Sequence, residues 1–180
     1  MLLTVVAIVV VLLIGLAVFV STRPATFRYT RRLAIAAPAA ELFEQINDLR
    51  KFQEWNPWAK VDPRCQIMYS GPATGVGSSY EWKGNKQVGE GAMTITETSP
   101  HQLVRARMDF RKPFAATHTA EFNFRPEGDQ TVVSWSMFGD NNFMGKIMTT
   151  VVDCDKMVGD EFAKGLAALK ASAESPATKV

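Results

Sequence analysis

The sequence is poor in the residues and motifs that define metal, redox and nucleotide sites. Its 180 residues include two cysteines, Cys65 and Cys154, which form no CxxC pair and have no histidine at metal-ligand spacing. It has no HExxH motif, no nucleophile elbow and no phosphate-binding loop, and Gly75-Val-Gly77 lacks the third glycine of a dinucleotide fingerprint. We therefore expect no metal, no other cofactor and no disulfide framework.

A surplus of one charge sign is also missing. Lys and Arg number 20 and Asp and Glu number 18, which gives a formal net charge of +2. Nucleic-acid-binding domains usually carry a strongly basic face, because contacts to phosphates supply much of their affinity. The composition therefore does not indicate a nucleic-acid partner, and no motif identifies a protein partner.

Charged side chains are absent from residues 1–20. Apart from Met1, Thr4 and Gly15, this segment contains only Leu, Ile, Val, Phe and Ala. About 20 apolar residues suffice for a helix to cross a bilayer core. We predict a single-pass transmembrane helix over 1–20, followed by a linker over 21–26. A cleaved signal peptide is the alternative, but the segment lacks a basic start and a small-x-small cleavage site.

The arginines near this segment all follow it, at Arg23, Arg28, Arg31 and Arg32. Basic residues are enriched on the cytoplasmic side of membrane spans. This asymmetry predicts that the soluble domain lies in the cytoplasm. Arg28, Arg31 and Arg32 also fall within the first predicted strand, so their interpretation as strand residues stays open.

Residues 27–174 have the length of one domain. Period-two alternation predicts a strand over 27–35, and Pro38 begins a helix that runs to Asn47, with a second short helix over 49–54. From 66 to 138, alternating segments separated by Gly and Pro turns predict six strands in an antiparallel meander.

The hydrophobic period changes to that of a helix after Gly139. A short helix is predicted from Phe143 and a longer one over about 153–173, with a flexible tail over 175–180. The predicted inner face of the long helix comprises Val151, Asp155, Val158, Phe162, Leu166 and Leu169. This order predicts an α+β fold in which one helix covers the apolar face of a sheet of about seven strands.

Several short motifs carry a family resemblance. They are Ala37-Pro38 before Leu42-Phe43, the stretch from Asp48 to Trp58, Gly75-x-Gly77-Ser78-x-Tyr80-x-Trp82, Gly89-x-Gly91-x-Met93-x-Ile95, and Asp155-Lys156-Met157-Val158-Gly159. Together they resemble the START-like, Bet v 1-like (SRPBCC) superfamily, and within it the polyketide cyclase/dehydrase-type group. The resemblance implies a helix-grip fold, in which a curved antiparallel sheet wraps around the C-terminal helix and leaves a cavity, with Trp55 and Trp58 at its mouth.

Strand parity selects the side chains that face this cavity, because alternate residues of a strand point to the same side. The predicted ligand contacts among them are Tyr80, Trp82, Met93, Met108, Phe122, Trp135 and Met137. The alternative is that these side chains form an ordinary filled core. The mixture of aromatic rings and flexible methionines favours an adaptable apolar pocket.

His118 and Asp155 complete the predicted site. His118 has the parity of Phe122 and Phe124, and Asp155 falls on the apolar stripe of the long helix. If both faced the cavity, they could act as a proton-transfer pair. A structural histidine and a carboxylate that stabilises the helix N-terminus are the alternatives.

A fold of this kind serves many functions, including lipid carriage, hormone reception and cyclisation. The sequence favours a membrane-anchored domain that binds a small hydrophobic or amphipathic, lipid-like ligand. One alternative is a cyclase or dehydratase that uses the same cavity, and another is a protein-interaction module whose cavity is collapsed.

The transmembrane interpretation predicts that the full-length protein stays in the membrane pellet after carbonate extraction, because an inserted apolar helix resists alkali. In sealed vesicles of known orientation, protease should digest the domain only from the cytoplasmic side. A soluble domain whose mass begins after residue 20 would contradict the uncleaved anchor.

Overall fold

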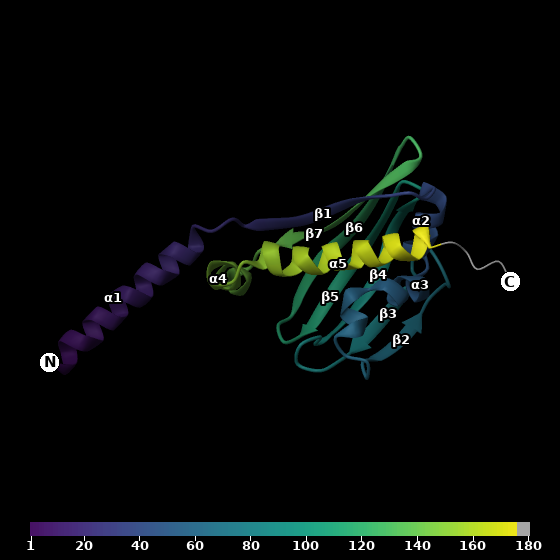
Figure 1. Cartoon of the computed structure of the whole chain (residues 1–180). Coiled ribbons are helices and arrows are strands. Elements are labelled where there is room, and N and C mark those ends of the chain that lie inside the picture. Colours follow the sequence, from purple (N-terminus) through teal and green to yellow (C-terminus); the bar gives the residue numbers. More distant parts are fainter. Residues whose placement is uncertain (176–180) are drawn as a thin grey trace.

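The computed structural model describes residues 1–175, so the predicted tail lies outside the described residues except for Ser175. Helix α1 (Leu2–Ser21) projects away from the domain, as Figure 1 shows. Within residues 1–175 it is the one helix long and apolar enough to cross a membrane, with a mean hydropathy of 3.3. Most of its large hydrophobic side chains are exposed, and Val20, near its C-terminal end, is buried.

Seven strands form one antiparallel sheet. They are β1 (Thr26–Ile35), β2 (Gln66–Ser70), β3 (Ser79–Lys83), β4 (Glu90–Ser99), β5 (Leu103–Lys112), β6 (Ala116–Glu127) and β7 (Gln130–Asp140). The order is β1-β7-β6-β5-β4-β3-β2, so the meander runs from β2 to β7 and β1 pairs with the last strand. The predicted sheet of about seven strands is confirmed. Two register shifts in the pairing of β4 with β5 accompany its curvature.

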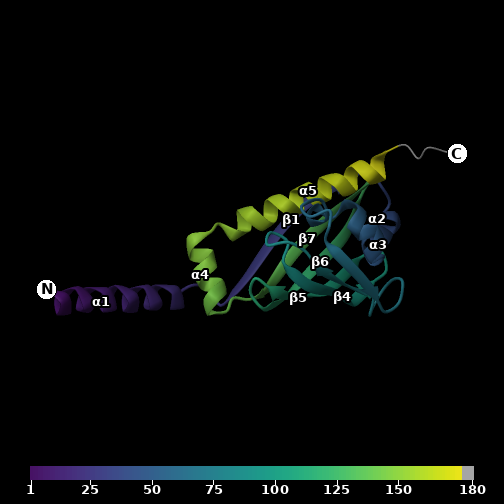
Figure 2. The ribbon, with the colours of Figure 1, turned by 90° about the horizontal axis from the view of Figure 1, so that it is seen from below.

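The helices are α2 (Ala39–Asn47), α3 (Leu49–Trp55), α4 (Phe143–Val151) and α5 (Cys154–Glu174), with a 3-10 turn, η1 (Pro57–Lys60), after α3. Side-chain oxygens at the N-termini accept backbone N–H bonds, as Asp48 does from Arg50 and Asp153 does from Lys156. Figure 2 shows α5 crossing the sheet on its concave side. The predicted α+β helix-grip architecture is confirmed.

The inner face of α5 is narrower than the sequence pattern predicts. Phe162, Leu166 and Leu169 are buried, as predicted, and Val158 is half-buried. Val151 was wrongly placed on this face: it belongs to α4 and is 75% exposed. The chain becomes extended at Val152, and Asp153 caps the next helix, so the stripe cannot continue through this break.

An aromatic cluster holds α5 against the sheet. The rings of Phe162 and Trp135 are stacked, with centroids 4.3 Å apart and planes inclined by 13°. Trp135 also makes edge contacts with Trp55 and Phe52 from α3, and with Trp58 from η1. Because large rings bury much apolar area, this cluster contributes strongly to the attachment of α5, which also packs along β1.

Two glycines allow α5 to approach the sheet closely. A Cβ at Gly165 would lie 2.7 Å from the Trp135 ring and 3.0 Å from Cδ of Pro57. A Cβ at Gly159 would lie 2.0 Å from the guanidinium of Arg31, which rests on the helix backbone at this position. Glycine at both positions therefore determines the depth of the helix in the grip.

We predict that Gly165→Ala lowers the free energy of unfolding by about 1–3 kcal/mol, because the methyl group would overpack a rigid indole ring. The usual effect of this substitution inside a helix is the opposite, a gain of roughly 0.5–1 kcal/mol. Urea unfolding of the full chain in detergent micelles measures the difference. Ser172→Ala, on the exposed side of α5, is the control, and a stabilised Gly165→Ala variant would contradict the packing argument.

Candidate functional site

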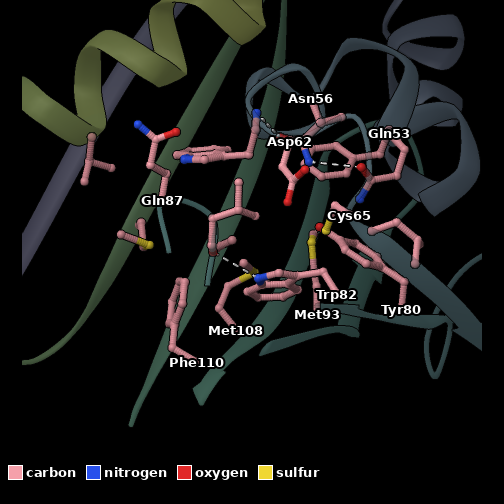
Figure 3. A pocket seen from close by; sticks show the side chains of 18 of the residues that line it. Gln53, Asn56, Asp62, Cys65, Tyr80, Trp82, Gln87, Met93, Met108 and Phe110 are labelled. Carbon is pink, nitrogen blue, oxygen red and sulfur yellow. Dashed lines mark hydrogen bonds between the residues drawn. The ribbon is translucent and has the colours of Figure 1, made fainter. Parts of the chain in front are cut away.

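A cavity of about 370 Å³ lies between the concave face of the sheet, α3 and the middle of α5. Figure 3 shows its wall, in which aromatic and sulfur-containing side chains predominate. Its volume falls in the range of pockets that hold drug-sized molecules. The alternative of an interaction module required a collapsed cavity, and the structure has an open one.

Most of the predicted ligand contacts line this cavity. They are Tyr80, Trp82, Met93, Met108, Phe122, Trp135 and Met137. The strand register explains why they converge. Met93 is paired with Tyr80 on one side and with Met108 on the other, and Phe122 is paired with Trp135. Side chains at paired positions share a face, so this wall crosses five strands.

The Trp82 ring lies over β4 because its partner there, Gly91, has no side chain. A Cβ at Gly91 would be 2.4 Å from the Trp82 ring. The indole Nε1 donates a hydrogen bond of 3.4 Å to the carbonyl oxygen of Val88. Satisfying this donor leaves the face of the indole as an apolar surface toward the cavity.

The strand pattern missed the wall that helices and loops provide. The residues added by the structure include Phe52, Gln53, Asn56, Asp62, Cys65 and Gln87. Phe110 of β5 also lines the cavity, as its parity with Met108 predicts. The spacing of Phe52, Gln53 and Asn56 on α3 places them together, and an amphipathic interpretation of this helix could have found them. Trp58 lines the cavity, whereas Trp55 is buried in the core, where its Nε1 donates to the Gln45 carbonyl.

Gln53 lies in the cavity wall and keeps its amide nitrogen buried. Its Oε1 accepts a 3.2 Å hydrogen bond from Nδ2 of Asn56. Its Nε2 is buried and has no hydrogen-bond partner within residues 1–175. The neighbouring Tyr80 is buried, which raises the pKa of its hydroxyl and keeps it protonated, against the opposing effect of the nearby Gln53 amide. Two neutral hydrogen-bonding groups therefore lie in one part of the wall.

Two titratable residues of the wall, Asp62 and Cys65, are held in place or kept neutral by their surroundings. Asp62 accepts hydrogen bonds from the backbone N–H groups of Arg64, at 3.1 Å, and Asn85, at 2.7 Å. It thereby ties the chain after η1 to the β3–β4 turn. Burial raises the pKa of the Cys65 thiol, so the thiol stays protonated at neutral pH and is a weak nucleophile.

His118 lies on the concave side but does not line the cavity. Its ring packs edge-on against Phe27, with centroids 4.8 Å apart, and lies 5.7 Å from the centroid of Phe110. The ring also rests on Gly139, where a Cβ would be 2.8 Å from Nδ1. Burial lowers the pKa of His118 below its ordinary 6.5, against the opposing effects of the Thr117 backbone and Asp140.

Asp155 is exposed and lies outside the cavity wall. Both its carboxylate oxygens accept hydrogen bonds of 3.2 Å from Arg31, which also donates to its backbone carbonyl at 2.9 Å. Arg31 points inward from β1, as its parity with Tyr29 and Leu33 indicates, and it is paired with Trp135. The structure thus gives His118 and Asp155 different partners and does not form the predicted proton-transfer pair.

A curved antiparallel sheet that grips a long helix over an apolar cavity is the helix-grip fold that the resemblance to the START-like, Bet v 1-like superfamily implied. The chain belongs to the family described as polyketide cyclase / dehydrase and lipid transport, whose model matches residues 26–174. No curated protein matches the chain.

Solved structures share this fold at low sequence identity. Truncated norcoclaurine synthase from Thalictrum flavum has a TM-score of 0.66 and 14% identity, covering 84% of this chain and 95% of its own. Major latex-like protein 151 from Panax ginseng has a TM-score of 0.55 and 13% identity, covering 84% and 99%. The Aha1 dimer from Colwellia psychrerythraea has a TM-score of 0.57 and 18% identity, covering 83% and 97%. At these identities the similarity shows the fold alone.

We predict that the wild-type protein loses stability relative to His118→Phe as the pH falls from about 7.5 to about 5. The pKa of folded His118 lies below 6.5, so the unfolded chain binds the proton more tightly in this range. Urea unfolding at both pH values measures the difference, and NMR titration of the imidazole gives the pKa. An imidazole that titrates at or above 6.5 would contradict the burial argument.

Proposed function

We propose that this protein is a membrane-tethered binding domain for a small, mainly apolar ligand that carries a hydrogen-bond acceptor at one end. The observation that carries the proposal is the cavity itself, about 370 Å³ in volume, with a mainly apolar wall beside which Nε2 of Gln53 is buried without a geometric hydrogen-bond partner among residues 1–175. A turn of the Gln53 side chain toward the cavity would let this donor bind a ligand carbonyl, hydroxyl or carboxylate and recover the free energy that an unpaired buried donor costs.

The anchor makes a membrane-derived ligand the favoured class. Helix α1 would hold the cavity near the bilayer surface, where the tether and the lipid-dissolved ligand both raise the local concentration. The family description, which includes lipid transport, supports the same class. The arginines that follow α1 favour a cytoplasmic position for the domain.

The rings and methionines of the wall suit a ligand without a rigid shape. Methionine side chains are flexible and polarizable, so Met93, Met108 and Met137 could adjust to chains of different length. The acceptor end would lie at Gln53 and Tyr80, and the apolar part would extend along Trp82, Met108 and Phe110. Selectivity would thus rest on one polar contact and the total apolar volume.

The primary test is native mass spectrometry of the full-length protein released from host membranes in mild detergent. We expect a bound small molecule whose mass adds to that of the protein. In parallel, a polarity-sensitive anilinonaphthalene dye reports on the cavity. Met108→Trp should fill part of the cavity and abolish dye binding, whereas Met68→Trp, at an exposed methionine of β2, should leave it unchanged. Equal dye binding by wild type and Met108→Trp would refute the cavity as the site.

The polar end of the site has its own test. A methyl ketone should displace the dye better than an alkane of the same chain length, because only the ketone accepts a hydrogen bond. Gln53→Leu should weaken ketone binding about fivefold to tenfold, the equivalent of about 1 kcal/mol, and leave alkane binding unchanged. If both competitors lose affinity equally, Gln53 acts through packing and not as a donor.

A further inference from the structure

Helix α4 has the polarity of a membrane-surface helix. Phe143, Met144, Ile147, Met148 and Val151 occupy one arc of it, and none of its residues is buried. Phe143 is 54% exposed, Met144 50% and Val151 75%. A surface helix of a soluble protein directs its apolar arc to the core. In α4 the apolar arc points away from the domain.

The polar side of α4 faces the protein and is fixed there. Nζ of Lys146 donates a 3.1 Å hydrogen bond to the carbonyl oxygen of Ser21, the last residue of α1. Just before α4, the backbone N–H of Asn141 donates to the Ala25 carbonyl at 2.7 Å. A Cβ at Gly145 would lie 2.3 Å from Oδ1 of Asn141. These contacts leave the helix little freedom to rotate and bury its apolar arc in the domain.

The position of α4 indicates that the membrane surface is the partner of its apolar arc. It contacts α1 at the end where the apolar segment stops, and it lies across the direction of α1 in Figures 1 and 2. If α1 spans the bilayer, a helix at this level and in this direction lies in the plane of the membrane surface. Lys146 and Arg23 lie at this level, where basic side chains are attracted to anionic lipid headgroups.

We propose that α4 is an interfacial helix that inserts its apolar arc into the bilayer beside the end of α1; this inference rests on the proposed membrane anchoring of α1. Such helices immerse their apolar face roughly 5–10 Å into the headgroup–acyl boundary. Because α4 leads directly into α5, whose Val158 and Phe162 line the cavity, docking would also fix the height and tilt of the cavity above the membrane.

The test is spin-label accessibility in the full chain, reconstituted into phosphatidylcholine vesicles that contain phosphatidylglycerol. Single cysteines replace Met144, Met148 and Thr149 of α4 in a Cys65→Ser, Cys154→Ser background. Leu12→Cys reports on the anchor. Asp129→Cys is the aqueous control, because the β6–β7 turn lies at the opposite end of β1 from α1, with Ile35 paired to Thr131 and Thr26 to Asp140.

We expect labels at 144 and 148 to collide with oxygen more than with a water-soluble nickel complex, at an immersion depth of about 5–10 Å. The label at 149 should be shallower than both, and the label at 129 should prefer nickel. Nickel-accessible labels at 144 and 148 would overturn the proposal, and so would labels shielded from both reagents, which would indicate a protein partner or a second copy.

The label at residue 12 separates the two possible failures. If it is lipid-embedded while those at 144 and 148 are aqueous, the anchor stands and the interfacial helix is refuted. If the label at 12 is itself aqueous, membrane anchoring fails, and α4 loses its partner with it. Ligand binding to the cavity is measured independently by the dye assay.

Discussion

The stacking of Phe162 on Trp135 is the contact on which the rest of the domain depends. It joins the C-terminal helix to a central strand pair and collects the rings of Phe52, Trp55 and Trp58 around it. The helix can come this close because Gly165 presents no side chain to the indole. A sheet with one apolar face requires such a cover, and α5 is the only helix of the described chain that runs along it.

The cavity is the part of the grip that this helix does not fill. Toward one end of α5, Leu166 and Leu169 pack fully against the sheet, and toward the other, Arg31 and Asp155 hold the first turn at the rim. Between them the wall is made of rings and methionines from five strands, and α3 with η1 closes the side. A mainly apolar space of this kind suits the ligand proposed above, an apolar molecule with one polar end.

The pairing of β1 with β7 connects the cavity to the proposed membrane anchor, α1. Helix α1 leads into β1, and β7 leads into α4, so the two segments next to the anchor are adjacent although more than a hundred residues separate them. The Asn141 bonds to Pro24 and Ala25 close this junction. One rigid sheet edge therefore carries the anchor, the proposed interfacial helix and the beginning of α5.

Short-range patterns in the sequence determined the apolar N-terminal helix, the strands and the cavity-facing parity of Tyr80, Trp82, Met93 and Met108. Parity could be read because burial of one sheet face imposes a period of two on each strand. The resemblance of the family motifs added the expectation that the sheet wraps around the C-terminal helix. Tertiary structure alone decided which inward residues line a space. His118 has the correct parity, but it lies among Phe27, Phe110 and Gly139, and Asp155 has the correct helical spacing, but Arg31 holds it at the surface. Gln53 belongs to the site because the packing of α3 brings it to the cavity wall. Such placements depend on contacts between elements far apart in the chain, and no local period encodes them.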